Sequence, residues 1–268
     1  MPAGEPPETI DRASATGATV RIEAGLAIGA TAVIERIALD VAPGEVIGLV
    51  GPSGCGKTSL LELVAGLREA SSGTVEVGGH ADPTDRLARC ALMPQRDLLL
   101  PWADATANAA IALENRGTRR TEARARASAT LARFGLGGFE RSRPDELSGG
   151  MRQRVAFART VLAEKPVLLL DEPFGALDAL TRGAMQEWLA GELSSGALGG
   201  PTVLLVTHDV EEALFLCDRV AVLAPRPTRI TELLAAPAPR SLPRAAALAD
   251  PLMASLRARA TELLGAPR

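Results

Sequence analysis

The sequence predicts an α/β fold with a parallel sheet, and two patterns carry that prediction. Between residues 167 and 223, short apolar segments typical of buried strands alternate with segments whose apolar residues recur at helical spacing. Further upstream, the apolar run 46–50 is followed by a glycine-rich turn and then by a helical pattern over 58–67. Strands that alternate with helices pair in parallel, because each helix carries the chain back to the start of the next strand.

Length and composition indicate a soluble globular protein. The 268 residues, 27.8 kDa, suffice for one large domain or two small ones. Hydrophobic residues make up 47% and charged residues 23%, which disfavours intrinsic disorder. The net charge is −3, and there are five Phe, two Trp and no Tyr, so neither a positive field nor many stacking rings are present for nucleic acid. We therefore expect no nucleic-acid partner.

Signals for secretion, membrane insertion and metal binding by cysteine are missing from the sequence. Cys55, Cys90 and Cys217 are isolated, so neither a disulfide framework nor a zinc site is predicted. The first 18 residues contain three prolines and three acids but no apolar core of a signal peptide. No run reaches the roughly 18 apolar residues of a transmembrane helix. If the protein works at a membrane, a partner must supply the spanning part.

The remaining elements follow from local composition. Residues 1–19 are rich in Pro, Thr, Ala and acid and are predicted to be a disordered tail, whereas strands are expected within 20–50 and at 74–77 and 91–93. Residues 102–143 are rich in Ala and Arg and predict an all-helical insert. A proline-rich link over 225–243 leads to a terminal helix with leucines on one face, at Leu248, Leu252, Leu256 and Leu263. In the second half we expect strands at 167–170, 202–206 and 220–223 and helices at 178–193 and 210–217.

A phosphate site is predicted at residues 51–58, Gly-Pro-Ser-Gly-Cys-Gly-Lys-Thr, which fit GxxxxGK[ST] between a strand and a helix. Glycines let backbone N–H groups turn toward an anion, and the helix N-terminus adds positive potential. Lys57 is then expected to reach the β- and γ-phosphates and the Thr58 hydroxyl to bind Mg²⁺. An idle glycine-rich turn is the alternative that the pattern alone leaves open.

A pair of carboxylates ends the next predicted core strand. Residues 167–170 are apolar, and Asp171 and Glu172 follow them directly. Ligands of α/β sheets bind at the carboxyl ends of the strands, so this pair should meet the phosphate site. Asp171 is suited to hold Mg²⁺ through water, and Glu172 to polarise a water for in-line attack on the γ-phosphate. The alternative is a pair of acids that caps a helix.

Further motifs resemble the ATP-binding cassette (ABC) ATPases. Residues 147–150, Leu-Ser-Gly-Gly, match the family signature LSGGQ, although Met151 replaces its glutamine. Gln95 matches the Q-loop, residues 176–178 (Ala-Leu-Asp) the D-loop, and His208 the switch histidine. The ordered motifs span about residues 20–223, which makes a chance match negligible.

The resemblance implies a P-loop NTPase (RecA-like) core with an antiparallel β subdomain and an inserted helical subdomain at about 100–158. The ATPase domain would span 20–235, and a linker and helix 236–268. Two copies would face each other head to tail, with each ATP between the phosphate loop of one and Ser148, Gly149 and Gly150 of the other. Asp178 would reach across the dimer axis, and Gln95 would report the γ-phosphate and Mg²⁺ to the insert.

The resemblance also assigns the expected site residues. The catalytic group is Lys57, Gln95, Glu172 and His208, and the Mg²⁺ ligands are Thr58, Gln95 and Asp171. The expected ATP contacts are Gly51, Pro52, Ser53, Gly54, Cys55, Gly56, Lys57, Thr58, Ser59, Ile28, Ser148, Gly149, Gly150 and Asp178.

The residue expected beneath the adenine departs from the family pattern. ABC cassettes usually stack adenine on an aromatic ring upstream of the phosphate loop, and here that position holds Ile28. Base stacking on aromatic side chains is worth about 1 to 3 kcal/mol. We therefore expect weaker ATP binding and poor discrimination among purine nucleotides.

Within the family, residues 99–102 (Leu-Leu-Pro-Trp), 174–182 and 205–213 resemble ATPases of nitrate, sulfonate, taurine and pyrimidine-precursor importers. This resemblance implies integral-membrane permease subunits as partners, an extracytoplasmic binding protein as an indirect partner, and a peripheral position on the cytoplasmic face of the cell membrane. The transported substrate would be a small organic anion or nutrient precursor. A soluble ABC ATPase that acts as a scaffold, as in iron–sulfur cluster assembly, is the alternative.

Three features carry two interpretations each. Trp102 is expected either to shape a groove for a permease helix or to be a buried core residue. Five arginines between residues 116 and 126 are expected to form a solvated helical face, partly paired between Glu122 and Arg126, or to touch a membrane partner. Cys55 lies at a position that the pattern leaves unconstrained, so it is expected to be incidental or, beside phosphate, reactive.

Overall fold

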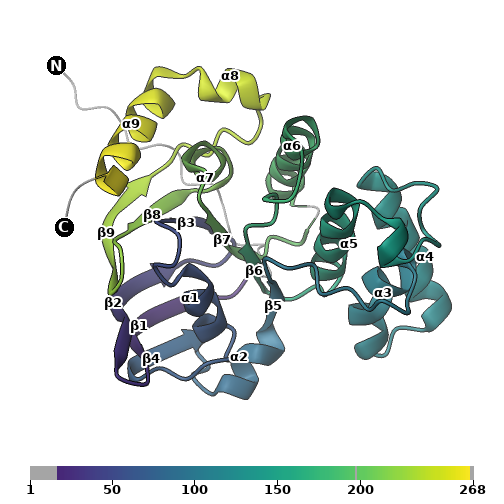
Figure 1. Ribbon diagram of the computed structural model, residues 1–268, viewed down its shortest axis with the longest axis horizontal. Helices are drawn as coiled ribbons and strands as arrows, with labels where there is room; N and C mark the ends of the chain where they lie inside the picture. Colours follow the sequence, from purple (N-terminus) through teal and green to yellow (C-terminus); the bar gives the residue numbers. More distant parts are fainter. Residues whose placement is uncertain (1–16, 197, 266–268) are drawn as a thin grey trace.

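The computed structural model describes residues 17–196 and 198–265. Within them, nine strands form one twisted sheet in the order β4-β1-β2-β9-β8-β3-β7-β6-β5 (Figure 1). The predicted tail at 1–19 lies mostly outside the described residues. The strands are β1 (Val20–Ile28), β2 (Thr31–Val41), β3 (Val46–Val50), β4 (Ser72–Val77), β5 (Cys90–Met93), β6 (Val167–Asp171), β7 (Thr202–Thr207), β8 (Arg219–Leu223) and β9 (Thr228–Ala235).

The centre of the sheet is parallel, as the alternation of strands and helices predicted. β3 pairs in parallel with β7 and β8, and β6 with β5 and β7. These strands are apolar along their length because both faces are covered. Ile47 and Leu49 of β3 face a core that contains α1, whereas Val46 and Val50 face the core beneath α5, α6 and α7.

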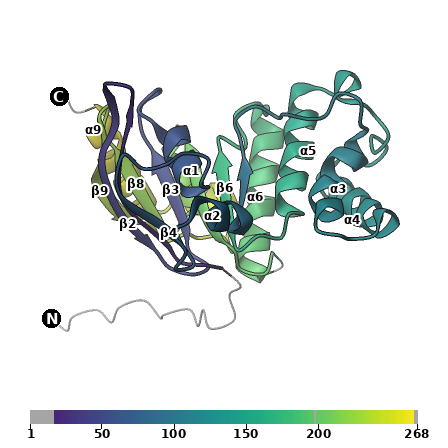
Figure 2. The ribbon, with the colours of Figure 1, turned by 90° about the horizontal axis from the view of Figure 1, so that it is seen from below.

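The helices divide between the two faces of the sheet and the insert. α1 packs on the face shared with the antiparallel strands β1, β2 and β4, and α3, α4 and α5 lie together beyond the β5 edge (Figures 1 and 2). The helices are α1 (Lys57–Val64), α2 (Pro83–Arg89), α3 (Ala105–Asn115), α4 (Arg120–Arg133), α5 (Gly149–Val161), α6 (Ala179–Ser195), α7 (Val210–Leu216), α8 (Arg244–Leu248) and α9 (Pro251–Gly265), with a 3₁₀ turn at Pro144–Glu146.

The proline-rich segment after β8 is not merely a link. It contains β9, which pairs antiparallel with β8 and in parallel with β2, and so joins the two parts of the sheet. Thr228 and Leu234 of this strand are buried. The prolines lie outside the strand, where no ladder hydrogen bond is lost. The short helix α2 was likewise not predicted.

The C-terminal leucines do not share one face. Pro251 begins a new helix, so Leu248 belongs to α8, and Leu252 on α9 is exposed. Met253 and Ala260 are the buried residues of α9. The expected single stripe was therefore wrong, because Leu248 lies on a separate helix and the Leu252 side chain, in the first turn of α9, is exposed.

The insert is helical as expected, but its arginines pair differently from the prediction. Arg126 pairs with Glu164 after α5 rather than with Glu122, and Arg116 contacts the same carboxylate at 3.1 Å. Arg124 pairs with Asp104 at 3.5 Å. These pairs join separate elements, so the arginine face is only partly solvated. Among the described residues, no helix is both long and apolar enough to cross a membrane.

Candidate nucleotide-binding site

The predicted site residues meet at one edge of the sheet. β3, β7, β6 and β5 are consecutive neighbours and run parallel, so their carboxyl ends lie side by side. The phosphate loop follows β3, His208 follows β7, Asp171 ends β6, and Gln95 lies two residues after β5. Motifs more than 150 residues apart in sequence therefore converge on the edge where α/β sheets bind ligands.

The phosphate loop turns tightly into the first helix. Gly56 precedes α1 with φ 116°, a backbone conformation that side chains rarely adopt, and a Cβ there would lie 3.0 Å from Val33 Cγ1 of β2. Lys57 is buried, and its ammonium donates to the carbonyls of Gly51 at 2.7 Å and Pro52 at 2.9 Å. The lysine therefore closes the loop on itself, beside the helix N-terminus that an anion would approach.

Cys55 is more constrained than the sequence pattern indicated. Its side chain is buried, and a Cβ on Gly51 would lie 3.1 Å from its sulfur. The buried Thr228 hydroxyl, on β9, donates to the Cys55 carbonyl and ties that strand to the loop. The cysteine thus packs beneath the loop, where it supports the loop's shape.

The Thr58 hydroxyl and Asp171 carboxylate lie together, as predicted. Thr58 Oγ1 donates to Asp171 Oδ2 at 2.7 Å. Burial raises the pKa of Asp171 above its ordinary value of 3.8, while the hydrogen bond from Thr58 and the charge of Lys57 act in the opposite direction. A hydroxyl and a carboxylate are oxygen ligands of the kind that Mg²⁺ prefers, so this pair fits a magnesium ion.

Glu172 lies at the centre of a second cluster. Its backbone has φ 48°, which is uncommon for a residue with a side chain, and its N–H donates to the Val206 carbonyl at 2.9 Å. Gln95 Nε2 donates to one carboxylate oxygen at 3.0 Å, and His208 Nδ1 lies 3.5 Å from the other. The strained turn aims a carboxylate out of β6 between an amide and an imidazole.

Known proteins are similar to this chain over most of its length. The ABC transporter family model matches residues 34–175, more than half of the chain. The chain belongs to the ABC transporter family. A taurine import ATP-binding protein of Mesorhizobium japonicum is 44% identical over 238 residues, which cover 86% of this chain and 90% of that protein. An aliphatic sulfonates import ATP-binding protein of Rhodococcus jostii is 50% identical over 194 residues, 72% of this chain and 74% of that one.

Solved structures agree with the family assignment. A dimeric ATP-binding cassette in a post-hydrolysis state, bound to ADP and phosphate, aligns with a TM-score of 0.69 at 26% identity and covers 81% of this chain and 98% of that one. The expected P-loop NTPase fold is therefore confirmed. This chain is an ABC ATPase, which binds nucleotide and couples ATP hydrolysis to transport.

The signature and D-loop residues of this ABC ATPase begin two helices. Ser148 Oγ accepts from Met151 N–H at 3.2 Å at the start of α5, and Asp178 Oδ1 accepts from the N–H groups of Leu180 and Thr181 at the start of α6. A hydrogen bond from the Thr181 side chain, together with these backbone hydrogen bonds, lowers the pKa of Asp178. Met151, in place of the usual glutamine, is partly buried against the core.

The segment after Gln95 is held by residues that the sequence analysis did not single out. Arg159 on α5 donates to the carbonyls of Leu98 at 2.9 Å and Asp97 at 2.7 Å. Asn108 on α3 is fully buried and accepts from Leu100 N–H at 2.7 Å. A polar side chain at a helical core position is the signal that could have identified Asn108.

Trp102 lies on this segment and is 72% exposed, so the buried-core interpretation was wrong. Leu98 and Phe139 are also exposed. The loop after Phe139 is joined to the start of α3 by hydrogen bonds from Ala105 N–H to Ser142 O and from Thr106 N–H to Glu140 O. Exposed large apolar side chains on one region are typical of protein interaction sites.

Ile28, expected beneath the adenine, ends β1 and is 49% exposed. It pairs with Thr31 across the hairpin, and Val33, two residues further along β2, contacts the phosphate loop. The hairpin thus brings an exposed aliphatic side chain to the neighbourhood of the loop. Its contact with adenine stays a prediction.

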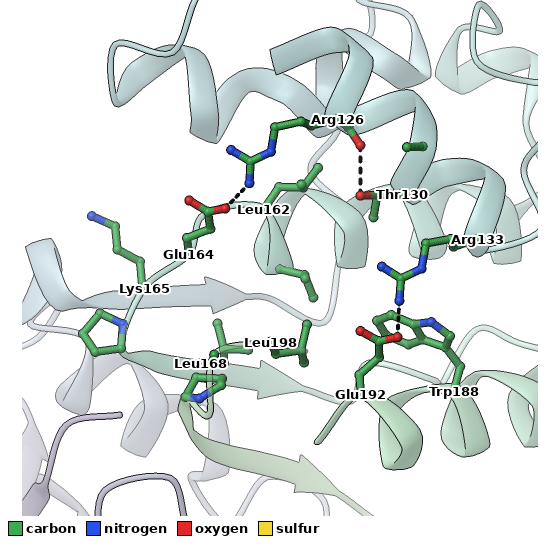
Figure 3. A pocket seen from close by; sticks show the side chains of 15 residues that line it. Arg126, Thr130, Arg133, Leu162, Glu164, Lys165, Leu168, Trp188, Glu192 and Leu198 are labelled. Atoms are coloured by element: carbon green, nitrogen blue, oxygen red, sulfur yellow. Dashed lines mark hydrogen bonds and ion pairs between the residues drawn. The ribbon is translucent and has the colours of Figure 1, made fainter. Parts of the chain in front are cut away.

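A large cleft in the described part of this ABC ATPase does not contain the phosphate loop. About 730 Å³ in volume, it lies between α4 and α6, and Trp188 and Leu168 line it (Figure 3). Arg133 of α4 pairs with Glu192 of α6 at its side. The cleft separates the insert from the core, and the nucleotide motifs lie elsewhere.

Proposed function

We propose that this chain is the ATPase subunit of an importer for taurine or a related small organic sulfonate. The observation that carries the ATPase chemistry is the convergence of Thr58 with Asp171 and of Gln95 with Glu172 and His208 at the ends of neighbouring strands. The direction of transport and the substrate class rest on the names of the taurine and sulfonate relatives. The same relatives favour an importer over the iron–sulfur scaffold considered above.

The proposed chemistry assigns one task to each group. Lys57 neutralises charge on the β- and γ-phosphates, and its present bonds to two carbonyls would be exchanged for phosphate oxygens. Glu172 holds and polarises the attacking water, with Gln95 and His208 on either side of its carboxylate. Thr58 and Asp171, with Gln95, are the proposed Mg²⁺ ligands, and the ion would neutralise charge that develops on the phosphates.

Ser148, Gly149 and Gly150 are proposed to complete the site of a second copy. They stand at the N-terminus of α5, where backbone N–H groups and the Ser148 hydroxyl could donate to an anion. The solved relatives are dimeric cassettes, which supports the sandwich arrangement. We propose that the ATPase domain spans residues 20–235 and that a C-terminal segment, which contains α8 and α9, spans 236–268.

The permease partner is proposed to dock on the exposed side chains of Leu98, Trp102 and Phe139. Arg159 and Asn108 hold the segment that carries two of these residues, and Gln95 lies at its start. A permease helix seated there would act on the nucleotide site through Gln95. The chain would thus lie on the cytoplasmic face of the membrane, and an extracytoplasmic binding protein would deliver substrate to the permease.

Uptake in the native host tests this function. Deletion of the gene should abolish accumulation of radiolabelled taurine or of an aliphatic sulfonate. The wild-type gene should restore it and Lys57→Ala should not, because that variant loses the cation at the phosphates. The Trp102→Ala variant should keep ATP binding but lose uptake. Unchanged uptake of both compounds in the deletion strain would refute the substrate class.

A further inference from the structure

Two adjacent glutamates at the start of α7 have opposite environments. Glu211 faces outward and pairs with Arg257 at 2.5 Å and Arg244 at 3.5 Å. Glu212, one residue further round the helix, is 3% exposed and accepts from Gln186 Nε2 of α6 at 2.8 Å. A carboxylate is costly to bury, so its place behind the nucleotide site calls for an explanation beyond packing.

Glu212 also holds the turn that carries His208. The Thr207 hydroxyl makes a side-chain hydrogen bond to Glu212, and the same hydroxyl accepts from Asp209 N–H at 3.0 Å. Thr207 and Asp209 are the two neighbours of His208. The buried carboxylate therefore orients the Thr207 hydroxyl, which in turn holds the Asp209 N–H on the other side of the histidine.

The carboxylate borders the same space as the catalytic cluster. A cleft of about 10 Å³, close to the volume needed for one water, is lined by Glu172, His208 and Glu212. We propose that Glu212 is a positioning residue, which holds the His208 turn against Glu172 and, through Gln186, ties it to α6. This inference rests on the role proposed above for His208.

The electrostatics of Glu212 add a pH dependence to this arrangement. Burial raises its pKa from 4.5 to about 7, although the hydrogen bonds from Gln186 and Thr207 and the charge of Arg182 oppose the rise, and Asp209 adds to it. Glu212 is thus ionised, and accepts both hydrogen bonds, mainly above pH 7. The other titratable groups around it are Glu172, His208 and Cys217.

Gln186 supplies a counterpart for the protonated form. Its Oε1 is buried and, within the described residues, has no hydrogen-bond partner. A protonated Glu212 can donate a hydrogen bond. If the Gln186 amide rotated by 180°, its Oε1 would face Glu212 and accept that hydrogen bond. The hydrogen bond from the Thr207 hydroxyl would weaken at the same time, because a neutral carboxyl is a weaker acceptor than a carboxylate. Proton uptake by Glu212 therefore weakens the hydrogen bonding that holds the turn around His208.

The test compares ATPase rates of the purified full-length chain from pH 6 to 8. Glu212→Gln mimics the protonated carboxyl, so its kcat should be close to wild type at pH 6 and several-fold lower at pH 8, with ATP affinity unchanged. All groups other than residue 212 are the same in both proteins, so the ratio of their rates isolates Glu212. Glu211→Gln is the matched control and should follow wild type. A ratio that is constant across the pH range would overturn the proposal.

A double-mutant cycle separates positioning from general destabilisation. Glu212→Ala and His208→Ala should each lower kcat by about tenfold or more, and the double variant should be no slower than His208→Ala alone. If the two substitutions instead lowered kcat independently, so that the double variant showed the product of the two losses, Glu212 would not act through His208. Wild-type rates for His208→Ala would instead refute the proposed role of the histidine and the inference with it. If Glu212→Ala does not fold, a cycle with Glu212→Gln at pH 8 gives the same comparison.

Discussion

Replacement of Asn108 by alanine should destabilise the protein more than the small size of the asparagine side chain implies. The side chain is fully buried and joins α3 to the segment that carries Trp102. Its Oδ1 accepts from Leu100 N–H at 2.7 Å, and its Nδ2 lies 3.1 to 3.2 Å from the carbonyls of Leu100, Ala103 and Asp104. Asn108→Ala leaves the Leu100 N–H without this partner.

The expected loss is about 3 kcal/mol of unfolding free energy. Each net hydrogen bond contributes roughly 1 kcal/mol, and a buried donor left unpaired costs about 1 to 3 kcal/mol. For a chain of this size the midpoint of thermal unfolding should fall by about 6 to 12 °C. The assay is urea and thermal denaturation followed by circular dichroism, because both report the same folded population.

Asn115→Ala is the matched control, since Asn115 is an exposed asparagine at the end of the same helix. It should change the unfolding free energy by less than about 0.5 kcal/mol. If Asn108→Ala were no more destabilising than Asn115→Ala, the amide would not be what holds the segment, and the reasoning from its hydrogen bonds would be wrong.

Three further predictions concern the nucleotide. Lys57→Ala should abolish hydrolysis, because the loop loses its positive charge, and normal turnover of the purified variant would contradict that. Glu172→Gln should bind ATP without hydrolysing it, so ATP and Mg²⁺ should trap a dimer in gel filtration; a nucleotide-bound variant that stays monomeric would argue against the sandwich. Ile28→Tyr should tighten ATP by about 1 kcal/mol, near fivefold, with no change for tripolyphosphate and with Ile28→Leu as control. Equal ATP affinity of wild type and Ile28→Tyr would mean that residue 28 does not lie beneath the base.

The sequence predicted the parallel strands and the convergence of motifs because both depend on local patterns. A run of apolar residues that ends in Asp171 and Glu172 specifies a buried strand with its acids at the carboxyl end, whatever the surroundings. The same holds for the glycine loop before Lys57. The order of the strands in the family's fold then places Thr58 beside Asp171 and Gln95 beside Glu172.

The features that were missed depend on contacts between distant segments. β9 lies between prolines, and its apolar residues do not alternate regularly with polar ones, so only its pairing with β2 and β8 shows that it is a strand. Glu164 attracts Arg126 from another element, which no helical spacing within α4 could indicate. Glu212 is indistinguishable from Glu211 by composition, and only the packing of α6 against α7 buries one of the two.

The two helix caps near the proposed dimer face have opposite capacities to bond a partner. A hydroxyl can both accept and donate hydrogen bonds. Ser148 Oγ accepts from the Met151 N–H, so its proton can still be donated to an outside acceptor. Asp178 accepts from the Leu180 and Thr181 N–H groups and from the Thr181 side chain, and as an ionised carboxylate it has no proton to donate. Phosphate at neutral pH is itself an acceptor. In a face-to-face pair, Ser148 could thus donate to the nucleotide, whereas Asp178 could only accept from a donor of the opposing polypeptide.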